Sequence, residues 1–124
     1  MKIEIPMKLP SLNEYIDACK IQKGKWNKGN QMKQDYQNDM IPFLSKMPKY
    51  NNPIKVHFLW IEENKRRDLD NVCFAKKFIL DAMVKAGKLK DDNRKFVQGF
   101  TDDFEYGKKA KVVLEIEEEE NEFK

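Results

Sequence analysis

The sequence predicts a single small α+β domain, of mixed α/β order, in which helices pack on one mixed sheet. Its 124 residues are typical of one domain and allow one buried core. Apolar residues alternate along residues 54–62, as in a half-buried strand, and recur at helical spacing along residues 71–86. Two more alternating segments follow, which favours a mixed sheet over a purely parallel one. The expected order is strand, helix, strand, helix, strand, strand.

The first part of the chain predicts a strand followed by a basic segment. Lys2–Met7 alternates charged and apolar residues, and Pro6 places this strand at a sheet edge. Residues 13–20 fit either a helical turn or irregular structure. Residues 20–33 contain five lysines and two glycines, which predicts a mobile basic loop.

The remaining elements follow from the same patterns. A helix is expected over residues 31–46, with Pro42 kinking it or ending it early. After it come a strand at 54–62, a polar loop at 64–71, the helix at 71–86 that ends at Gly87, and strands at 95–104 and 109–117 around a turn at 105–108. The last two strands are expected to pair as a hairpin.

Charge is distributed unevenly along the chain. The chain has 24 lysines and arginines against 21 aspartates and glutamates, a net charge of +3. Six glutamates and one lysine lie from Glu115 onward, so residues 1–114 carry a net charge of +8. A body this basic attracts polyanions, most often nucleic acid, although a solvated basic surface explains the composition as well. The acidic run marks a solvated tail at residues 117–124, after a domain at residues 1–116.

Composition also excludes several classes of protein. No apolar run approaches the ~20 residues of a membrane-spanning helix, and no apolar secretory segment is visible. Cys19 and Cys73 lie far apart without metal-ligand spacing, and the single histidine, His57, lies on the strand face opposite the apolar set. A zinc site and a disulfide framework are not expected, and the chain fits the cytoplasm.

Two aspartates lie between the strand at 54–62 and the helix at 71–86. Asp68 and Asp70 are two residues apart, so both side chains can point toward one spot. Carboxylate oxygens are the ligands that Mg²⁺ prefers. Asp is also a preferred N-cap residue, and taken alone, helix capping is the better explanation.

A second acidic pair, Asp91–Asp92, follows the same helix. That helix is about 24 Å long at ~1.5 Å per residue, and the intervening residues 87–92 span at most ~20 Å when extended. The chain can therefore fold back to bring this pair near Asp68 and Asp70. Without further information, a solvated turn is the simpler alternative.

Helix geometry separates two adjacent lysines. At ~100° per residue, Lys77 lies about 20° from Asp70 around the helix axis, and Lys76 lies about 120° away. Lys77 therefore shares the face of the acidic turn, where an ammonium can stabilise charge on a phosphoryl group. The alternative is that both lysines only solvate the exposed face of the helix.

Several motifs occur together in this chain: Leu9–Asn13 followed by Tyr15, Arg67–Asn71, Lys77 with Asp81–Met83, Lys85–Gly87 and Asp91–Asp92. In this combination they resemble the RusA family of Holliday junction resolvases, from Pro10 to about Asp92. The resemblance implies a small dimeric, Mg²⁺-dependent endodeoxyribonuclease that cuts four-way DNA junctions by paired symmetric nicks. At the family level it also implies a role in DNA recombination and repair, in phage or prophage.

The family's site residues are three metal-binding aspartates and one essential lysine, and they match Asp68, Asp70, Asp92 and Lys77. The lysine is matched by its spacing to Asp81. The chain has about three more residues between Asn71 and this lysine than the family pattern has, so Lys76 is the alternative. The resemblance thus implies Mg²⁺, with Mn²⁺ as a substitute, and hydrolysis of phosphodiesters by metal-activated water.

The expected DNA-binding residues are basic or aromatic: Lys23, Lys25, Trp26, Lys28, Lys65, Arg66, Arg67 and Lys76. In the basic loop, lysines can follow phosphates, while Trp26 either stacks on an exposed base or folds onto the body. A homodimer with two matched sites suits the two-fold symmetry of a four-way junction. The competing hypotheses are a non-catalytic module that binds branched DNA and a small adaptor that binds proteins through its acidic tail.

Overall fold

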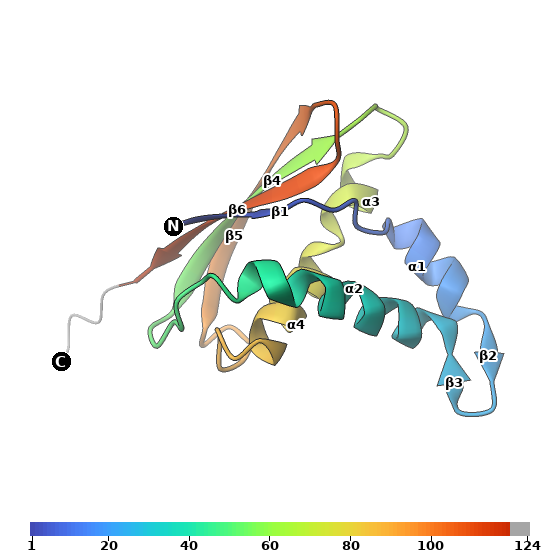
Figure 1. The fold of residues 1–124 in the computed structure, drawn as a ribbon, viewed down its shortest axis with the longest axis horizontal. Helices are drawn as coiled ribbons and strands as arrows, with labels where there is room; N and C mark the ends of the chain where they lie inside the picture. The colour runs from blue at the N-terminus through green and yellow to red at the C-terminus, as the bar shows by residue number, and fades with distance from the viewer. Residues whose placement is uncertain (120–124) are drawn as a thin grey trace.

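The structure, a computed structural model, describes residues 1–119 (Figure 1). Its elements in chain order are β1 (Lys2–Ile5), α1 (Leu12–Cys19), β2 (Gln22–Lys23), β3 (Trp26–Asn27), α2 (Lys28–Leu44), β4 (Ile54–Glu62), α3 (Leu69–Cys73), α4 (Lys76–Lys85), β5 (Val97–Tyr106) and β6 (Lys111–Glu118). Four strands form a sheet in the order β1-β6-β4-β5, and β2 pairs with β3 alone. The predicted small α+β domain with a mixed sheet is confirmed.

β4 lies inside the sheet and joins its parallel and antiparallel parts. It pairs with β5 in parallel and with β6 in antiparallel orientation, and β1 completes the sheet by pairing with β6. Parallel neighbours need a long crossover connection, and here α3 and α4 supply it between β4 and β5. This connection carries most of the predicted site.

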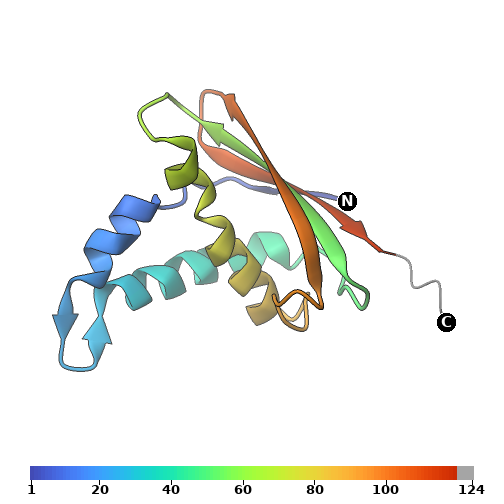
Figure 2. The same ribbon diagram turned by 180° about the vertical axis from the view of Figure 1, so that it is seen from behind.

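The helices pack on one face of the sheet, as Figures 1 and 2 show from opposite sides. On that face, Val56, Phe58 and Trp60 of β4 are buried, as the alternating pattern predicts. His57 lies on the other face, with its ring nitrogens 2.6 Å from Thr101 Oγ1 and 2.6 Å from a Glu117 carboxylate oxygen. It is a strand residue, as expected.

The predicted hairpin of the last two strands is wrong. β5 and β6 do not pair, because β4 lies between them. β4 is rich in apolar residues, and a position between two strands satisfies its backbone hydrogen-bonding groups on both edges. β5 contains Asp102, Asp103 and Glu105, and charged residues of this kind suit an edge strand.

The single helix predicted over residues 71–86 is two helices. The break lies at Phe74–Ala75, where Ala75 N–H donates to the Val72 carbonyl and Lys77 N–H to that of Phe74, at 3.3 and 3.1 Å. These bonds span three residues instead of four, which tightens the turn. Phe74 stacks on Tyr15 of α1 with ring centroids 5.4 Å apart, so tertiary packing accompanies the break.

The basic segment at residues 20–33 is ordered secondary structure, not the predicted mobile loop. Ser11 and Glu14 form a capping box that starts α1 as a regular helix. After the short β2–β3 hairpin, the Asn27 side chain caps α2, which begins three residues earlier than predicted. α2 continues for two residues past Pro42 before it ends at Leu44.

The first residues of the predicted acidic tail belong to the folded body. Glu117 and Glu118 are the last residues of β6, and Glu118 accepts hydrogen bonds from the backbone N–H groups of Asn51 and Asn52, each at 3.2 Å. The backbone N–H of Glu119 donates to the Pro53 carbonyl at 2.8 Å, and the last residues of the predicted tail, 120–124, lie outside the described residues. Among residues 1–119, none of the helices is long and apolar enough to cross a membrane.

Candidate functional site

Two motifs that are far apart in the sequence meet in the structure. The Arg67 guanidinium donates to the Leu9 carbonyl at 2.9 Å. Four residues later, the Asn71 side-chain oxygen accepts from the backbone N–H of Asn13 at 3.1 Å. The segment between Arg67 and Asn71 is therefore held at both ends by the start of α1, which fixes the position of the two aspartates within it.

Arg67, one of the expected DNA-binding residues, is held by partners within the fold. Its guanidinium also donates to Glu62 at 2.7 Å and lies 3.7 Å from Glu14. Its side chain is 16% exposed. Because these partners use the charge and the donors of the guanidinium, Arg67 holds the acidic turn in place and does not present a free charge to solvent.

Asp68 and Asp70 are both exposed at the start of α3. Asp68 occupies the N-cap position, but its side chain makes no capping hydrogen bond. Asp70 accepts only a local bond, from the backbone N–H of Asn71 at 3.0 Å. The capping alternative thus explains the position of Asp68 but gives its carboxylate no partner, and both carboxylates remain open to a cation from solvent.

Asp92 lies in a second cluster, formed by α4 and the loop that follows it. The Lys77 ammonium bridges it to Asp81, at 3.0 Å from Asp92 Oδ2 and 3.1 Å from Asp81 Oδ1. Lys33 of α2 lies 2.8 Å from the other oxygen of Asp81. Hydrogen bonding to Asp81 and then to Lys77 lowers the pKa of Asp92, and the bonds to Asp92 and Asp81 raise the pKa of Lys77. The loop after α4 does fold back, but it brings Asp92 to Asp81.

Asp102 forms a third charged group that the sequence analysis missed. Its carboxylate accepts from the Trp60 indole N–H at 2.8 Å and forms an ion pair with Lys76. The Lys76 ammonium also lies 4.0 Å from the centre of the Phe100 ring. The only signal in the sequence was an aspartate at an inward position of an otherwise alternating strand, and nothing there indicated its partners.

Cys73 connects this group to the acidic turn. Burial raises the pKa of its thiol, Lys76 lowers it, and the carboxylates of Asp102 and Asp70 raise it further. Both carboxylates therefore act on the same thiol. Lys76 lies on this side of α4, while Lys77 lies with Asp81 and Asp92.

The three aspartates predicted as metal ligands do not form one cluster. Within residues 1–119, no three carboxylate, histidine or cysteine side chains are placed to hold one metal ion together. Asp68 and Asp70 have the oxygen chemistry that Mg²⁺ prefers and are not engaged by a basic side chain in this part of the chain. Asp92 already has the Lys77 ammonium as its cation. Two of the three predicted ligands thus lie exposed in the acidic turn, and the third belongs to a separate cluster.

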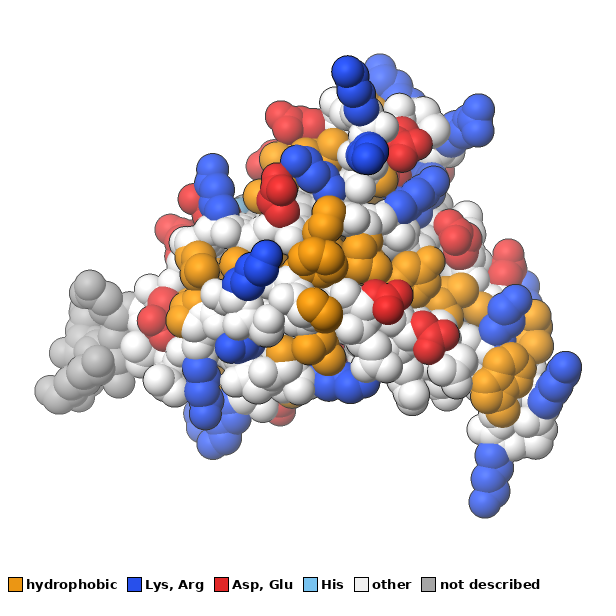
Figure 3. All heavy atoms as spheres, in the orientation of Figure 1, with side chains coloured by type: hydrophobic (Ala, Val, Ile, Leu, Met, Phe, Trp, Pro, Cys, Tyr) orange, Lys and Arg blue, Asp and Glu red, His pale blue; other side chains and the backbone are white. Residues whose placement is uncertain are grey.

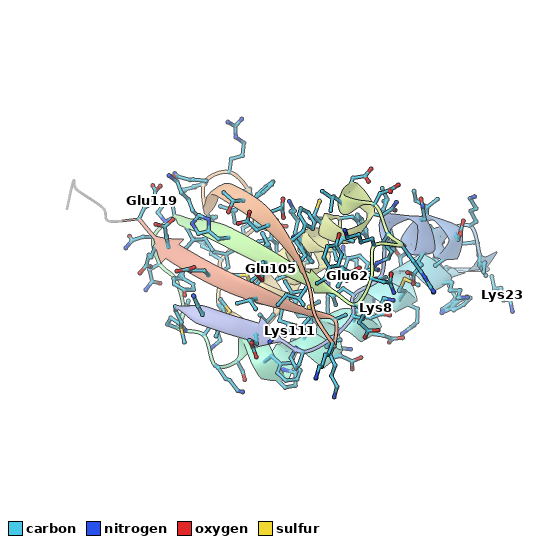
Figure 4. The ribbon with its side chains drawn as sticks, turned by 90° about the horizontal axis from the view of Figure 1, so that it is seen from above. Lys8, Lys23, Glu62, Glu105, Lys111 and Glu119 are labelled. Atoms are coloured by element: carbon cyan, nitrogen blue, oxygen red, sulfur yellow. The ribbon has the colours of Figure 1, made fainter. Side chains whose placement is uncertain are left out.

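The other predicted DNA-binding residues lie at two ends of the molecule. Lys65 and Arg66 are exposed in the loop before α3, with the Lys65 ammonium 5.2 Å from the Tyr106 ring centre. The remaining residues, Lys23, Lys25, Trp26 and Lys28, are exposed on or beside the β2–β3 hairpin. Figure 4 places Lys23 at the end of the molecule opposite Glu119.

An open depression of about 880 Å³ lies where β1, the end of β4 and the β5–β6 connection meet. Its charged lining mixes both signs, and consists of four lysines and three glutamates: Lys8, Lys108, Lys109, Lys111, Glu4, Glu63 and Glu105 (Figure 4). Because these charges largely offset one another, the depression provides little net attraction for an anion. It is not part of the candidate site.

Comparison with known proteins does not assign the chain to a family. No protein-family model matches the chain, and no curated protein is significantly similar to it.

Proposed function

We propose that this protein is a Mg²⁺-dependent endodeoxyribonuclease that cuts branched DNA, with a four-way junction as its substrate. The observation that carries the proposal is the arrangement of the acidic turn. Arg67 and Asn71 fix it to the start of α1, while Asp68 and Asp70 stay exposed without basic partners in the described residues. A structural role for these carboxylates would require partners that the turn does not provide.

In this proposal the residues of the crossover have separate tasks. Asp68 and Asp70 bind Mg²⁺, while Asp92, which the RusA resemblance implies as a third ligand, lies apart from them with Lys77 and Asp81. When bound, Mg²⁺ supplies Lewis acidity toward water and the scissile phosphate. Hydrogen bonds to Asp81 and then to Lys77 lower the pKa of Asp92, and Lys77 places a positive charge on α4. Lys65 and Arg66 attract the DNA backbone toward the turn.

An enzyme explains this surface better than a module that only binds DNA. Two uncompensated carboxylates next to Lys65 and Arg66 repel phosphates and weaken binding unless a cation bridges them. A binding module gains nothing from this arrangement. The non-catalytic DNA-binding module is therefore the second candidate function. Its only support is the basic surface, which supports the nuclease equally.

A homodimer is part of the proposal. Both edge strands of the sheet, β1 and β5, carry unpaired backbone groups on their outer edges. A two-fold dimer would present two equivalent acidic turns to the opposed strands of a junction. Sedimentation velocity at micromolar concentration should give about twice the 14.8 kDa mass of the chain. A monomer under those conditions contradicts paired symmetric cutting.

Nicking of a synthetic four-way junction with and without Mg²⁺ tests the activity. Asp68→Asn and Asp70→Asn should each lower the nicking rate by orders of magnitude, because a neutral amide is a poor ligand for Mg²⁺. Junction binding without Mg²⁺ should persist. Asp103→Asn is the matched control and should cut like the wild type, because Asp103 is an exposed aspartate of β5 outside the acidic turn. Normal cutting by both turn variants would refute the nuclease, and binding without any cutting would favour the module.

A further inference from the structure

The β2–β3 hairpin has two chemically different faces. Lys23 pairs with Trp26, Gln22 pairs with Asn27, and the backbone N–H of Lys28 donates to the Ile21 carbonyl at 3.0 Å. Successive pairs of a hairpin point to opposite faces. One face, called the outer face below, therefore carries Ile21, Lys23, Trp26 and Lys28. The inner face carries Gln22 and Asn27.

The inner face anchors the hairpin to the body. The Asn27 amide donates to the Cys19 carbonyl at 2.9 Å and to Gln22 Oε1 at 2.8 Å, and its oxygen accepts from Asn30 N–H at 3.1 Å. At the base of the hairpin, a Cβ on Gly29 would lie 2.3 Å from Cys19 Sγ, so only glycine fits this contact. The ends of α1 and α2 are therefore packed tightly beneath the hairpin.

The turn itself is also well defined. Gly24, the first of the two turn residues, has φ +58°, and within residues 1–119 positive φ values occur only at glycines. Glycine in this position is typical of the type II′ turn, whose twist matches that of the strands. The hairpin thus holds the outer face in one orientation before any ligand binds.

The outer face is both apolar and positively charged. Trp26 is 41% exposed and Ile21 is 40% exposed. Lys23, Lys25 and Lys28 are exposed, and within the described part of the chain none of these three forms an ion pair. In Figure 3 this end of the molecule shows hydrophobic surface with blue lysine side chains on several sides.

A nucleic acid with unstacked bases matches this face. A base has a flat apolar surface that can stack on an indole, and each nucleotide carries a phosphate that can approach a nearby lysine. In an intact duplex the base faces are hidden by stacking, so an indole on a fixed hairpin has no base to contact. A single strand, or the centre of a branched junction, exposes such bases.

We propose that the outer face of the hairpin is a binding site for unstacked nucleotides, which makes the protein prefer single-stranded or branched DNA over duplex. The inference rests on the proposed function only in taking DNA as the polyanion. It needs neither the acidic turn nor Mg²⁺. The hairpin recognises the structure of the DNA, and the crossover carries the proposed chemistry.

Binding measured in EDTA, which prevents cleavage, tests the proposal with three probes. They are a dT20 single strand, an intact four-way junction, and a linear duplex with the sequence of one junction arm. Trp26→Leu keeps an apolar side chain but removes the aromatic face, and Trp26→Phe keeps an aromatic face. We expect Trp26→Leu to weaken binding to dT20 and to the junction about tenfold, from the stacking of one base, and to leave duplex binding within about twofold. Trp26→Phe should restore most of the lost affinity.

The lysines are tested by the salt dependence of dT20 binding. Lys23→Ala, Lys25→Ala and Lys28→Ala combined should reduce the slope of log affinity against log salt by about two, since each phosphate contact contributes ~0.7 for a single strand. Lys46→Ala, just beyond the other end of α2, is the control and should leave the slope unchanged. Thermal melting of each variant verifies that it is folded.

Three outcomes would overturn the proposal. One is equal binding of dT20 by Trp26→Leu and the wild type. Another is an equal loss for all three probes, which would make the hairpin a general anion site. The third is dimerisation that Trp26→Leu abolishes without DNA, which would make the outer face an interface between copies. If the wild type binds dT20 but does not nick the junction with Mg²⁺, the proposed nuclease is refuted and the hairpin site is retained.

Discussion

α4 separates two charged regions of the candidate site that differ in burial. On the sheet side, the ion pair of Lys76 and Asp102 has side chains that are 15% and 20% exposed. On the side toward α2, the side chain of Lys77 is 57% exposed between two carboxylates. Adjacent residues of a helix point ~100° apart, so one step in sequence moves an ammonium from one region to the other.

The difference shows that the two lysines are not interchangeable. The Lys76 ammonium lies near the Phe100 and Phe58 rings. It compensates the Asp102 carboxylate, which also accepts a hydrogen bond from the buried Trp60 indole. Lys77 compensates a pair of carboxylates on two elements, α4 and the loop that follows it. A buried pair loses much when one partner is removed, whereas an exposed bridge loses little. Three predictions test this comparison, in order of expected effect.

The largest effect is expected on the sheet side. Asp102→Asn keeps an oxygen for the Trp60 indole but leaves the Lys76 ammonium without its counter-charge, and should lower the free energy of unfolding by about 2 kcal/mol. Urea unfolding followed by far-UV circular dichroism measures it. Asp103→Asn, the next residue but on the exposed face, should change stability by less than about 0.5 kcal/mol. Equal effects for both variants would remove the distinction between the two regions.

A smaller effect is expected on the α2 side. Lys77→Ala removes the bridge between Asp81 and Asp92 and should cost about 0.5–1 kcal/mol, because the lysine is more than half exposed and solvent screens it. The pKa of Asp92 should rise, since one of the three hydrogen bonds that lower it is lost. A carboxyl NMR titration measures this directly. Lys85 lies on α4, as Lys77 does, and within residues 1–119 its ammonium bonds only to the neutral Asn38 side chain of α2. Lys85→Ala should therefore leave the pKa of Asp92 unchanged.

The smallest effect depends on pH. Because folding lowers the pKa of Asp92, its contribution to stability is present above the unfolded pKa of about 4 and is lost as pH falls through the lower folded value. The stability difference between wild type and Asp92→Asn should therefore be constant from about pH 5 to 7 and shrink toward pH 2. Urea midpoints across this range measure it. A difference that grows in acid would contradict the assigned direction.

Lys77 should behave in the opposite sense. Folding raises its pKa, so its contribution is fully present below the unfolded value of about 10.4 and is lost as pH rises through the folded value. Both limits lie outside the neutral range. The bridge is therefore intact near neutral pH, so it would contribute no pH dependence to the proposed nicking in that range.

Elements with strong, local patterns could be predicted from the sequence alone. The alternation of Ile54, Val56, Phe58 and Trp60 predicts β4, and the fold class follows from the order of such segments. The placement of Asp68 and Asp70 before a helix was also predictable, because a polar run between a strand and a helical pattern has few alternatives. These features depend on residues close together in the chain.

Tertiary packing set which segments meet. It placed β4 between β5 and β6, broke the long helix beside Tyr15, ordered the basic loop on Asn27, and sent Asp92 to Lys77 and Asp81 instead of the acidic turn. It also joined Asp102 to Lys76 across 26 positions. Each of these outcomes depends on burial and pairing between distant residues, whose energies exceed the local preferences that periodicity reports.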